Sequence, residues 1–387
     1  MSAPASLHCL VNPHPGVPGL VTLPEGGWRR ARAAITAWPG HAPAPPTGLP
    51  GLAAALGLAA LHWKDEGRRA GPEAVGGAEA LGAAYAVQRL LSAELARRGV
   101  ARAAEAPELE SGRLAEATRG ITLASGPEAG FALAVAWGAR RFHARCVALL
   151  PAGSPAAWRE ALAGQGAEVL ECPGGPAGER CAVRDAARRA EAGGGLFLSD
   201  HSWPGQTEVA RDVMQGCRLA AEEAFSALPA PPSHVFVPGG SGALAAAVAV
   251  EARRLGGTAP RLVVVEAEGE GQQPEGLMRE AAHSWTGHSR AGRGEAGEST
   301  SLLAWGELER AAFACLAVPP EAVAGARRSL SAGIDGAIRS GERGAAVMAG
   351  LLLAVRDPAA RSALGLDAGS RVLAFGADAP FAGAAAG

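Results

Sequence analysis

Lys64 stands out among the residues that could do chemistry because it is the only lysine in the chain. It opens the charged triplet Lys64-Asp65-Glu66, which follows the apolar run Leu61–Trp63 and precedes a glycine-rich segment. This order places Lys64 at the end of a predicted strand. A Schiff base requires a side-chain primary amine, so any group held in that way would have to be bound to Lys64.

A second stretch with a clear chemical use is the turn Gly239-Gly240-Ser241-Gly242. It follows the apolar run His234–Pro238, which predicts a buried strand, and precedes the predicted helix Ala243–Leu255. A glycine-rich turn before a helix exposes backbone N–H groups at the positive end of the helix dipole, where anions bind. The turn, together with Ala243, is therefore a candidate site for a phosphate, sulfate or carboxylate. The alternative is an ordinary strand-to-helix turn, which also favours glycine.

The composition excludes several classes of protein. A formal net charge of -2 over 387 residues, a pI near 6.5 and basic runs no longer than a pair give no electrostatic basis for binding nucleic acid or an anionic membrane. Gly, Arg or Glu interrupts each apolar stretch before it reaches the length of a membrane span. The sequence predicts a globular protein with one large or two modest domains.

The cysteines predict a reducing compartment. The six cysteines form no CxxC pair and no repeated spacing, and no signal peptide is recognisable at the N-terminus. We therefore expect reduced thiols in a cytoplasmic protein, with the cysteines acting as small buried hydrophobes and no metal site.

Short apolar runs alternate with helical segments through most of the chain. Alternation of this kind predicts an α/β fold with parallel strands and helices on both faces of the sheets. Strands are predicted at Gly120–Leu123, Cys146–Leu150, Glu168–Glu171, Gly195–Ser199, Arg261–Glu266 and Arg371–Phe375, and helices at Ala78–Leu91, Ser154–Gly164 and Glu179–Ala192.

Three segments lack this alternation. Residues 1–50 are rich in proline and are predicted to form an extended arm that ends at the short helix Leu52–Leu58. Ala101–Arg119 reads as a polar connector, and Gly269–Ser299, rich in Gly and Glu, as a long surface loop or lid.

Several motifs carry a resemblance to a known family. Lys64-Asp65-Glu66 followed by Leu81-Gly82-Ala83-Ala84-Tyr85-Ala86 resembles the KDES…LGGxYA pattern of fold-type-II pyridoxal-phosphate (PLP) enzymes, in particular the diaminopropionate ammonia-lyases. The segment 200–206 with Met214-Gln215-Gly216 resembles QDTAWEGY…IMQGY, and 338–345 resembles IISGESGA. The resemblance spans nearly the whole chain.

This resemblance implies an architecture and a ligand. The expected fold has two parallel or mixed-sheet domains with a cleft between them, a large domain of residues 1–100 and 229–387 and a small domain of residues 101–228. The expected assembly is a homodimer. The expected ligands are PLP, with its phosphate at Gly239–Gly242, and a small anionic or amino-acid-like substrate.

The position of the family's cofactor-binding lysine is not a lysine here. Counting from Lys64 puts Gly76 at that position, and counting back from Tyr85 puts Glu79 there. We prefer Glu79, because a glycine-rich loop absorbs insertions more easily than a helix does. The alternative is that Glu79 has no functional role, because glutamate is favoured in the first turn of any helix.

Other functional positions of the family are changed as well. The aspartate and asparagine of its TDGNHG turn correspond to Ser125 and Pro127, and its hydroxyl near the pyridine nitrogen falls within Gly376-Ala377-Asp378. Asp200 matches an aspartate that acts in acid/base chemistry in the family. It could equally be a turn or helix-capping residue after a strand.

Three of the changed groups, the lysine, the asparagine and the hydroxyl, are specific to PLP and lie on three separate segments, whereas the motifs of the scaffold persist. We interpret this as a fold-type-II protein that has lost covalent PLP. Three functions stay open: cofactor-independent acid/base chemistry of a lyase type with Glu79 and Asp200, a non-catalytic binding or dimerisation partner, and a PLP-dependent ammonia-lyase that uses Lys64.

Overall fold

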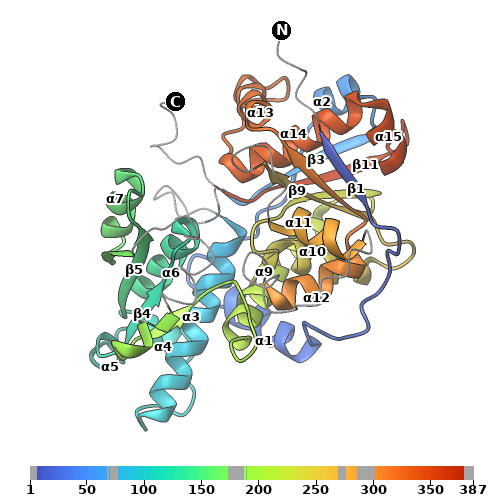
Figure 1. The fold of residues 1–387 in the computed structure, drawn as a ribbon. Helices are drawn as coiled ribbons and strands as arrows, with labels where there is room; N and C mark the ends of the chain where they lie inside the picture. Colours follow the sequence, from blue (N-terminus) through green and yellow to red (C-terminus); the bar gives the residue numbers. More distant parts are fainter. Residues whose placement is uncertain are drawn as a thin grey trace. The chain divides into compact units, whose positions relative to one another are not determined.

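The computed structural model describes residues 7–67, 69, 77–172, 187–188, 190–268, 276–285 and 301–378. The chain forms two compact units. The first comprises Met1–Thr22, Pro43–Ala78 and Ala220–Pro380, and the second Leu23–Ala42, Glu79–Leu219 and Phe381–Gly387. Each unit is an α/β structure with its own sheet, which confirms the predicted fold class (Figure 1).

The first unit is built on a seven-stranded sheet in the order β1-β10-β9-β8-β11-β3-β2. The edge strands β1 and β2 are antiparallel to their neighbours, and the strands between them run parallel. The strands are β1 (His8–Val11), β2 (Thr47–Gly48), β3 (Ala60–Asp65), β8 (His234–Pro238), β9 (Arg261–Ala267), β10 (Ala314–Val318) and β11 (Arg371–Gly376).

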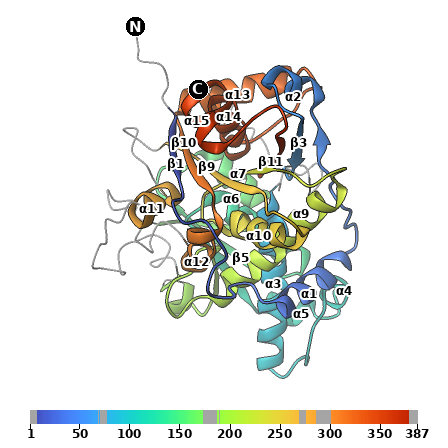
Figure 2. The same ribbon diagram turned by 90° about the vertical axis from the view of Figure 1, so that its right-hand side faces the viewer.

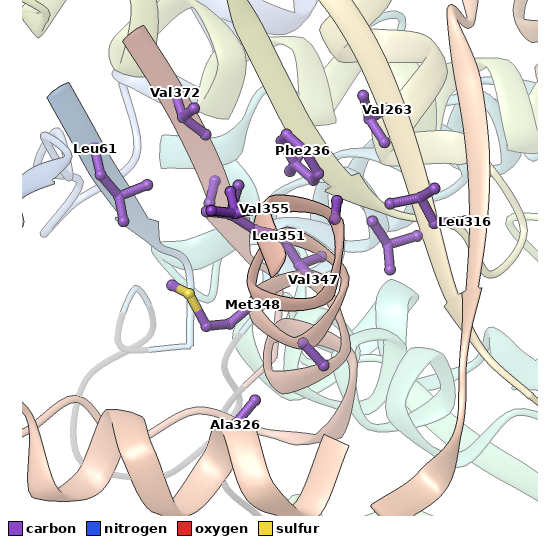
Figure 3. Packing of buried hydrophobic residues seen from close by; sticks show 14 of the residues in the cluster. Leu61, Phe236, Val263, Leu316, Ala326, Val347, Met348, Leu351, Val355 and Val372 are labelled. Carbon is purple, nitrogen blue, oxygen red and sulfur yellow. The ribbon is translucent and has the colours of Figure 1, made fainter. Parts of the chain in front are cut away.

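Helices lie on both faces of this sheet (Figure 2). The helices of the first unit are α2 (Pro50–Leu56), α10 (Ala243–Ala252) with a 3-10 turn at Arg253–Leu255, α11 (Gly276–Trp285), α12 (Leu302–Ala311), α13 (Pro320–Ala332), α14 (Glu342–Arg356) and α15 (Pro358–Leu364). On one face, Val347 and Leu351 of α14 point toward Phe236 and Leu316 of the strands (Figure 3). This core fixes the carboxyl ends of the strands, where the candidate site residues lie.

The second unit holds a parallel four-stranded sheet in the order β6-β5-β4-β7. Its strands are β4 (Thr122–Ser125), β5 (Arg145–Pro151), β6 (Glu168–Cys172) and β7 (Leu196–Leu198). Its helices are α1 (Glu25–Thr36), α3 (Ala78–Arg97), α4 (Ala106–Glu110), α5 (Ala115–Arg119), α6 (Ala129–Arg141) and α7 (Ala156–Gly164), and α9 (Glu208–Ala227) begins in it.

Helix α3 belongs to the second unit, whereas the sequence grouped residues 1–100 into one domain. Glycines on the neighbouring helices explain this placement, because they let backbones approach closely. A Cβ on Gly82 of α3 would lie 2.5 Å from the Val213 carbonyl oxygen of α9, and a Cβ on Gly138 of α6 would lie 3.0 Å from the Ala84 Cα. A single sequence does not show which small residues lie where helices cross, so the domain to which α3 belongs could not be predicted from them.

The structure corrects three expectations about irregular segments. The arm contains helix α1, whose buried Trp28, Ala31 and Ile35 have helical spacing that the flanking prolines obscured. The polar connector contains α4 and α5, and the proposed lid contains α11. Helix α11 is fixed by tertiary contacts, since the Glu266 carboxylate accepts hydrogen bonds from the backbone N–H groups of Leu277 and Met278.

Other expectations have clear outcomes within the described residues. The predicted helix Glu179–Ala192 lies largely outside them, as does Cys181. None of the five described cysteines forms a disulfide with another described cysteine. Burial raises the pKa of the Cys146 thiol to about 12, so this residue is a poor nucleophile. No described helix combines the length and apolarity required to cross a membrane.

Candidate functional site

Lys64 is buried in a closed set of charged groups. It lies near the carboxyl end of β3 with no exposed side-chain surface, and its Nζ lies 2.7 Å from Glu66 Oε1 and 3.2 Å from Glu223 Oε2. It also donates to the carbonyl oxygen of Ala44. An ammonium group has three donors, so the partners account for all of them. The Nζ of Lys64 is thus fully engaged by groups of the chain itself.

Arg69 completes this charged cluster, which consists of Lys64, Glu66, Arg69 and Glu223. Arg69 Nη2 donates to Glu66 Oε1 at 2.7 Å, and Nη1 donates to Glu223 Oε1 at 3.2 Å. Burial would raise the pKa of Glu66, but the charges and hydrogen bonds of Arg69 and Lys64 lower it below its ordinary value. Two cations and two carboxylates therefore neutralise each other beside β3.

The backbone around the charged cluster is also fixed. Glu66 donates its N–H to the Gly376 carbonyl oxygen of β11 at 2.8 Å and accepts from the Gly77 N–H at 2.9 Å. Glu66 and Gly77 therefore lie side by side. Gly76, one of the two positions considered for the family's lysine, lies outside the described residues. Glu79, the other, lies half-buried in the first turn of α3, in the second unit.

The turn Gly239–Gly242 joins β8 to α10 and has the geometry of an anion site. Gly240 and Gly242 have φ of 63° and 84°, a left-handed conformation that favours glycine. The Gly239 N–H donates to the Val265 carbonyl oxygen at 2.9 Å. Within the part of the chain that the structure describes, the N–H groups of Gly240 and Ser241 have no acceptor. They precede the N-terminus of α10 and can therefore bind an anion.

Charged side chains approach this turn from two other elements of the first unit. A Cβ on Gly239 would lie 2.4 Å from Oε1 of Glu266, so only glycine fits there. A Cβ on Gly240 would lie 3.7 Å from Nη1 of Arg343, at the start of α14. The guanidinium adds positive charge beside the turn. This approach could not be predicted from the sequence, because Arg343 is about a hundred residues away from Gly240 in the chain.

Asp378, the last residue of the segment Gly376-Ala377-Asp378, caps α14. Its carboxylate oxygens accept from the backbone N–H groups of Arg343 at 3.0 Å and Gly344 at 2.9 Å. A carboxylate at this position satisfies the first N–H groups of the helix and interacts favourably with its dipole. The contacts of Asp378 are those of a structural helix cap.

In the second unit, Ser125 and Asp200 lie at the same edge of the sheet. Strands β4 and β7 are parallel neighbours with Ser125 opposite Leu198, and Asp200 follows two residues later. Both are buried, with 0% and 5% of their surface exposed. Asp200 Oδ1 lies 3.0 Å from Nδ1 of His201. The structure therefore places two predicted site residues at the same end of the sheet and adds the imidazole of His201.

The remaining site residues that the sequence missed are Glu66, Arg69 and Glu223 around Lys64, and Glu128 beside Ser125. Glu128 caps α6, because its carboxylate accepts from the N–H groups of Gly130 and Phe131. Its position before an apolar helix is a recognisable capping signal. Glu223 gave no such signal, since it meets Lys64 only through the tertiary fold.

A family model for pyridoxal-phosphate dependent enzymes matches residues 37–375. The chain therefore belongs to the pyridoxal-phosphate dependent enzyme family. Among relatives, the diaminopropionate ammonia-lyase of Salmonella typhimurium is 29% identical over 233 residues, which are 59% of this chain and 56% of that protein. The Escherichia coli K12 enzyme of the same name is 28% identical over 213 residues, 54% of this chain and 50% of that protein. The matched part thus spans about half the length of these relatives.

Solved structures agree on the fold. The crystal structure of diaminopropionate ammonia lyase from Escherichia coli in complex with D-serine has a TM-score of 0.81 at 22% identity and covers 98% of this chain and 95% of that chain. Maize serine racemase has a TM-score of 0.67 at 15% identity and covers 93% of this chain and 94% of that chain. The fold-type-II architecture expected from the motifs is confirmed.

The described residues fit the phosphate group of PLP but do not fit its covalent attachment. The turn Gly239–Gly242 and Arg343 suit a phosphate or another small anion. The donor set for covalent attachment does not fit, because the only side-chain primary amine is that of Lys64, and two carboxylates and a carbonyl oxygen bind its Nζ. The Asp378 carboxylate is held by two backbone N–H groups of α14.

Proposed function

We propose that this chain is an enzyme of the lyase type that acts on a small anionic, amino-acid-like substrate without covalently bound PLP. The observation that carries the proposal is the burial of Lys64, whose Nζ is bound to Glu66 and Glu223 with no exposed side-chain surface. Freeing this amine would leave two buried carboxylates with less compensation. Membership of an enzyme family whose relatives are named ammonia-lyases supports the reaction class.

Within this proposal the chain's own groups bind the anion and move the protons. In the first unit, the backbone N–H groups of Gly240 and Ser241, with the guanidinium of Arg343, form an anion site. Asp200 and Glu79 are the acid/base groups, and Ser125 contributes a hydroxyl. A carboxylate serves as an acid near neutral pH when desolvation raises its pKa more than nearby positive charge lowers it.

The test combines cofactor detection with turnover. The purified chain is incubated with PLP, reduced with borohydride and digested, and the peptide containing Lys64 is examined by mass spectrometry. Ammonia release from 2,3-diaminopropionate and from D-serine is measured with and without added PLP. We expect no reduced adduct on Lys64 and ammonia release that does not depend on PLP.

Each other result selects a different function. An adduct on Lys64 with ammonia release that requires PLP would restore the orthodox ammonia-lyase. No ammonia from either amino acid in either condition would contradict the proposed activity and favour a non-catalytic binding partner. The expected homodimer is a separate proposal, which light scattering coupled to size-exclusion chromatography tests.

The anion site predicts a matched pair of variants at Gly240. Gly240→Asp places a negative charge among the N–H groups and next to Arg343, so we expect at least tenfold weaker binding of inorganic phosphate by calorimetry. Gly240→Asn has nearly the same shape, also tolerates φ of 63° and carries no charge, so its affinity should stay within about threefold of the parent. Equal affinities in all three proteins would reduce the turn to a structural role.

Glu79 has its own test. If it transfers protons, Glu79→Gln should lower turnover by about 10²–10⁴-fold while the circular dichroism spectrum stays unchanged. Glu94→Gln, at the far end of the same helix, is the control, since Glu94 is paired with Arg97 and Arg98. Full turnover in Glu79→Gln would show that Glu79 is only a first-turn helix residue and leave Asp200 as the candidate. Glu79→Lys with PLP asks whether an amine at this position restores cofactor attachment.

A further inference from the structure

Four polar residues follow one another directly after β7: Ser199, Asp200, His201 and Ser202. Parallel strands end at the same edge of a sheet, so this segment lies beside the end of β4, where Ser125 is opposite Leu198. Apart from His201, the members of this group are at most 7% exposed. A run of buried polar residues at the carboxyl edge of a parallel sheet is the usual location of a ligand site in such folds.

Asp200 and His201 form a coupled pair. His201 Nδ1 lies 3.0 Å from Asp200 Oδ1, and the two side chains are 20% and 7% exposed. Neighbouring residues of an extended strand point to opposite faces, so this contact requires a bend. The bend is fixed by the His201 backbone N–H, which donates to Ser199 Oγ at 3.0 Å. A carboxylate that accepts from Nδ1–H selects this tautomer and makes Nε2 the basic nitrogen.

The Ser125 hydroxyl is an independent observation that points to a ligand. The residue has no exposed surface, and among the described residues its Oγ has no hydrogen-bond partner. Buried hydroxyls are almost always paired, because an unpaired one is destabilising. Glu128 lies in the turn that follows Ser125, but its carboxylate oxygens accept hydrogen bonds from the N–H groups of Gly130 and Phe131 at 3.1 Å and 2.5 Å. A polar atom of a bound substrate would satisfy the hydroxyl.

We propose that His201 is the catalytic proton-exchanging residue of this edge, that Asp200 is its positioning residue, and that Ser125 Oγ donates a hydrogen bond to the substrate. This rests on the proposed function and changes the role of Asp200 from direct acid/base to support. The His201 Nε2 accepts a proton from the substrate and becomes an imidazolium, which the Asp200 carboxylate stabilises. The electron pair of the broken substrate C–H bond forms a C=C bond as the bond to the leaving amine breaks. The same proton then passes from Nε2 to the nitrogen of that amine, which leaves as ammonia, so His201 returns to its starting state.

The pairing is tested without any substrate. The full chain is labelled with ¹³C,¹⁵N-histidine, His201 is assigned by its loss in His201→Gln, and its ring nitrogens are followed by NMR as a function of pH. We expect the Nδ1–H tautomer in the parent, and in Asp200→Asn a mixed tautomer and a His201 pKa lower by about one unit or more. A His201 titration that is identical in the parent and in Asp200→Asn would overturn the pairing. The exposed His14 should be unaffected by the substitution.

The catalytic role is tested by turnover of 2,3-diaminopropionate. His201→Gln should lose about 10²–10⁴-fold, at least as much as Asp200→Asn, and Asp200→Glu should recover part of the loss. Loss in Asp200→Asn with parental turnover in His201→Gln would overturn the inference and return Asp200 to a direct role, while the proposed function would stand. If the parent protein shows no turnover, both the proposed function and the catalytic role of His201 are contradicted. The pairing of Asp200 with His201 is then decided by the NMR experiment alone.

Ser125→Ala separates a ligand-binding hydroxyl from a structural one. Removing an unpaired buried hydroxyl should leave the Tm of the ligand-free chain unchanged or higher, while the KM for the amino acid rises by about tenfold. A lower Tm with an unchanged KM would show that the hydroxyl has a structural partner and does not contact the substrate.

Discussion

Lys64→Met is expected to lower the free energy of unfolding by about 3–5 kcal/mol, the range for removing one partner of a buried ion pair. The methionine side chain fills similar space, so most of the loss comes from Glu66 and Glu223, which keep their negative charges after Lys64, one of the two cations that contact both of them, is removed. Glu66 is fully buried and cannot recover its hydration. Urea unfolding followed by far-ultraviolet circular dichroism measures the change.

An exposed ion pair gives the matched control. Arg211→Met also removes a cation from a carboxylate, but its partner Glu208 has 82% of its side chain exposed. Such pairs contribute about 0–1 kcal/mol, so this variant should unfold nearly as the parent does. Equal, small losses in both variants would mean that the charged cluster is open to water and that Lys64 is accessible after all.

The same cluster predicts how stability depends on pH. The pKa of Glu66 is lower in the folded chain than its ordinary value, so the stability it contributes is complete above that value, near 4.5. The contribution is lost as the pH falls from there through the lower folded-state pKa. Parent and Lys64→Met should therefore differ most at neutral pH and converge under acid conditions. A gap that widened on acidification would contradict this assignment.

Gly126→Ala should be the most damaging change in the second unit, at about 3–5 kcal/mol. Gly126 has φ of 147°, which residues with a side chain rarely adopt and which costs about 1–3 kcal/mol. An added Cβ would also lie 2.0 Å from the Leu149 carbonyl oxygen of β5, and backbone cannot move aside as a flexible side chain can. Thermal or urea unfolding of the purified variant measures the loss.

Gly153→Ala isolates the two contributions. Gly153 also has a positive φ, 83°, but nothing lies within 4 Å of the Cβ it would carry. This variant should lose only the conformational part, about 1–2 kcal/mol. A similar loss in both variants would show that the contact with Leu149 is relieved at little cost. The comparison matters for function because Gly126 follows Ser125 directly, so its turn fixes the edge where Ser125 and Asp200 lie.

Much of the architecture could be predicted from local sequence. Continuous apolar runs such as Arg261–Glu266 and His234–Pro238 gave strands at nearly the observed bounds, because a strand buried on both faces leaves no place for polar residues. The glycine turn before α10 could also be predicted, because it is visible in a few consecutive residues between a predicted strand and a predicted helix. Segments whose order depends on distant partners were missed. Helix α11, for example, is capped by Glu266 from another element.

The sequence by itself determined that Lys64 is the only lysine of the chain, and it predicted that other residues stand at the positions of the family's lysine and asparagine. Only the tertiary structure decided what Lys64 does, because its partner Glu223 is 159 residues away and the two meet through the fold of the first unit. The approach of Arg343 to Gly240 and the adjacent ends of β4 and β7 were decided in the same way. The physical reason is that hydrophobic periodicity specifies each strand or helix separately, whereas strand order and register determine which side chains meet at a sheet edge.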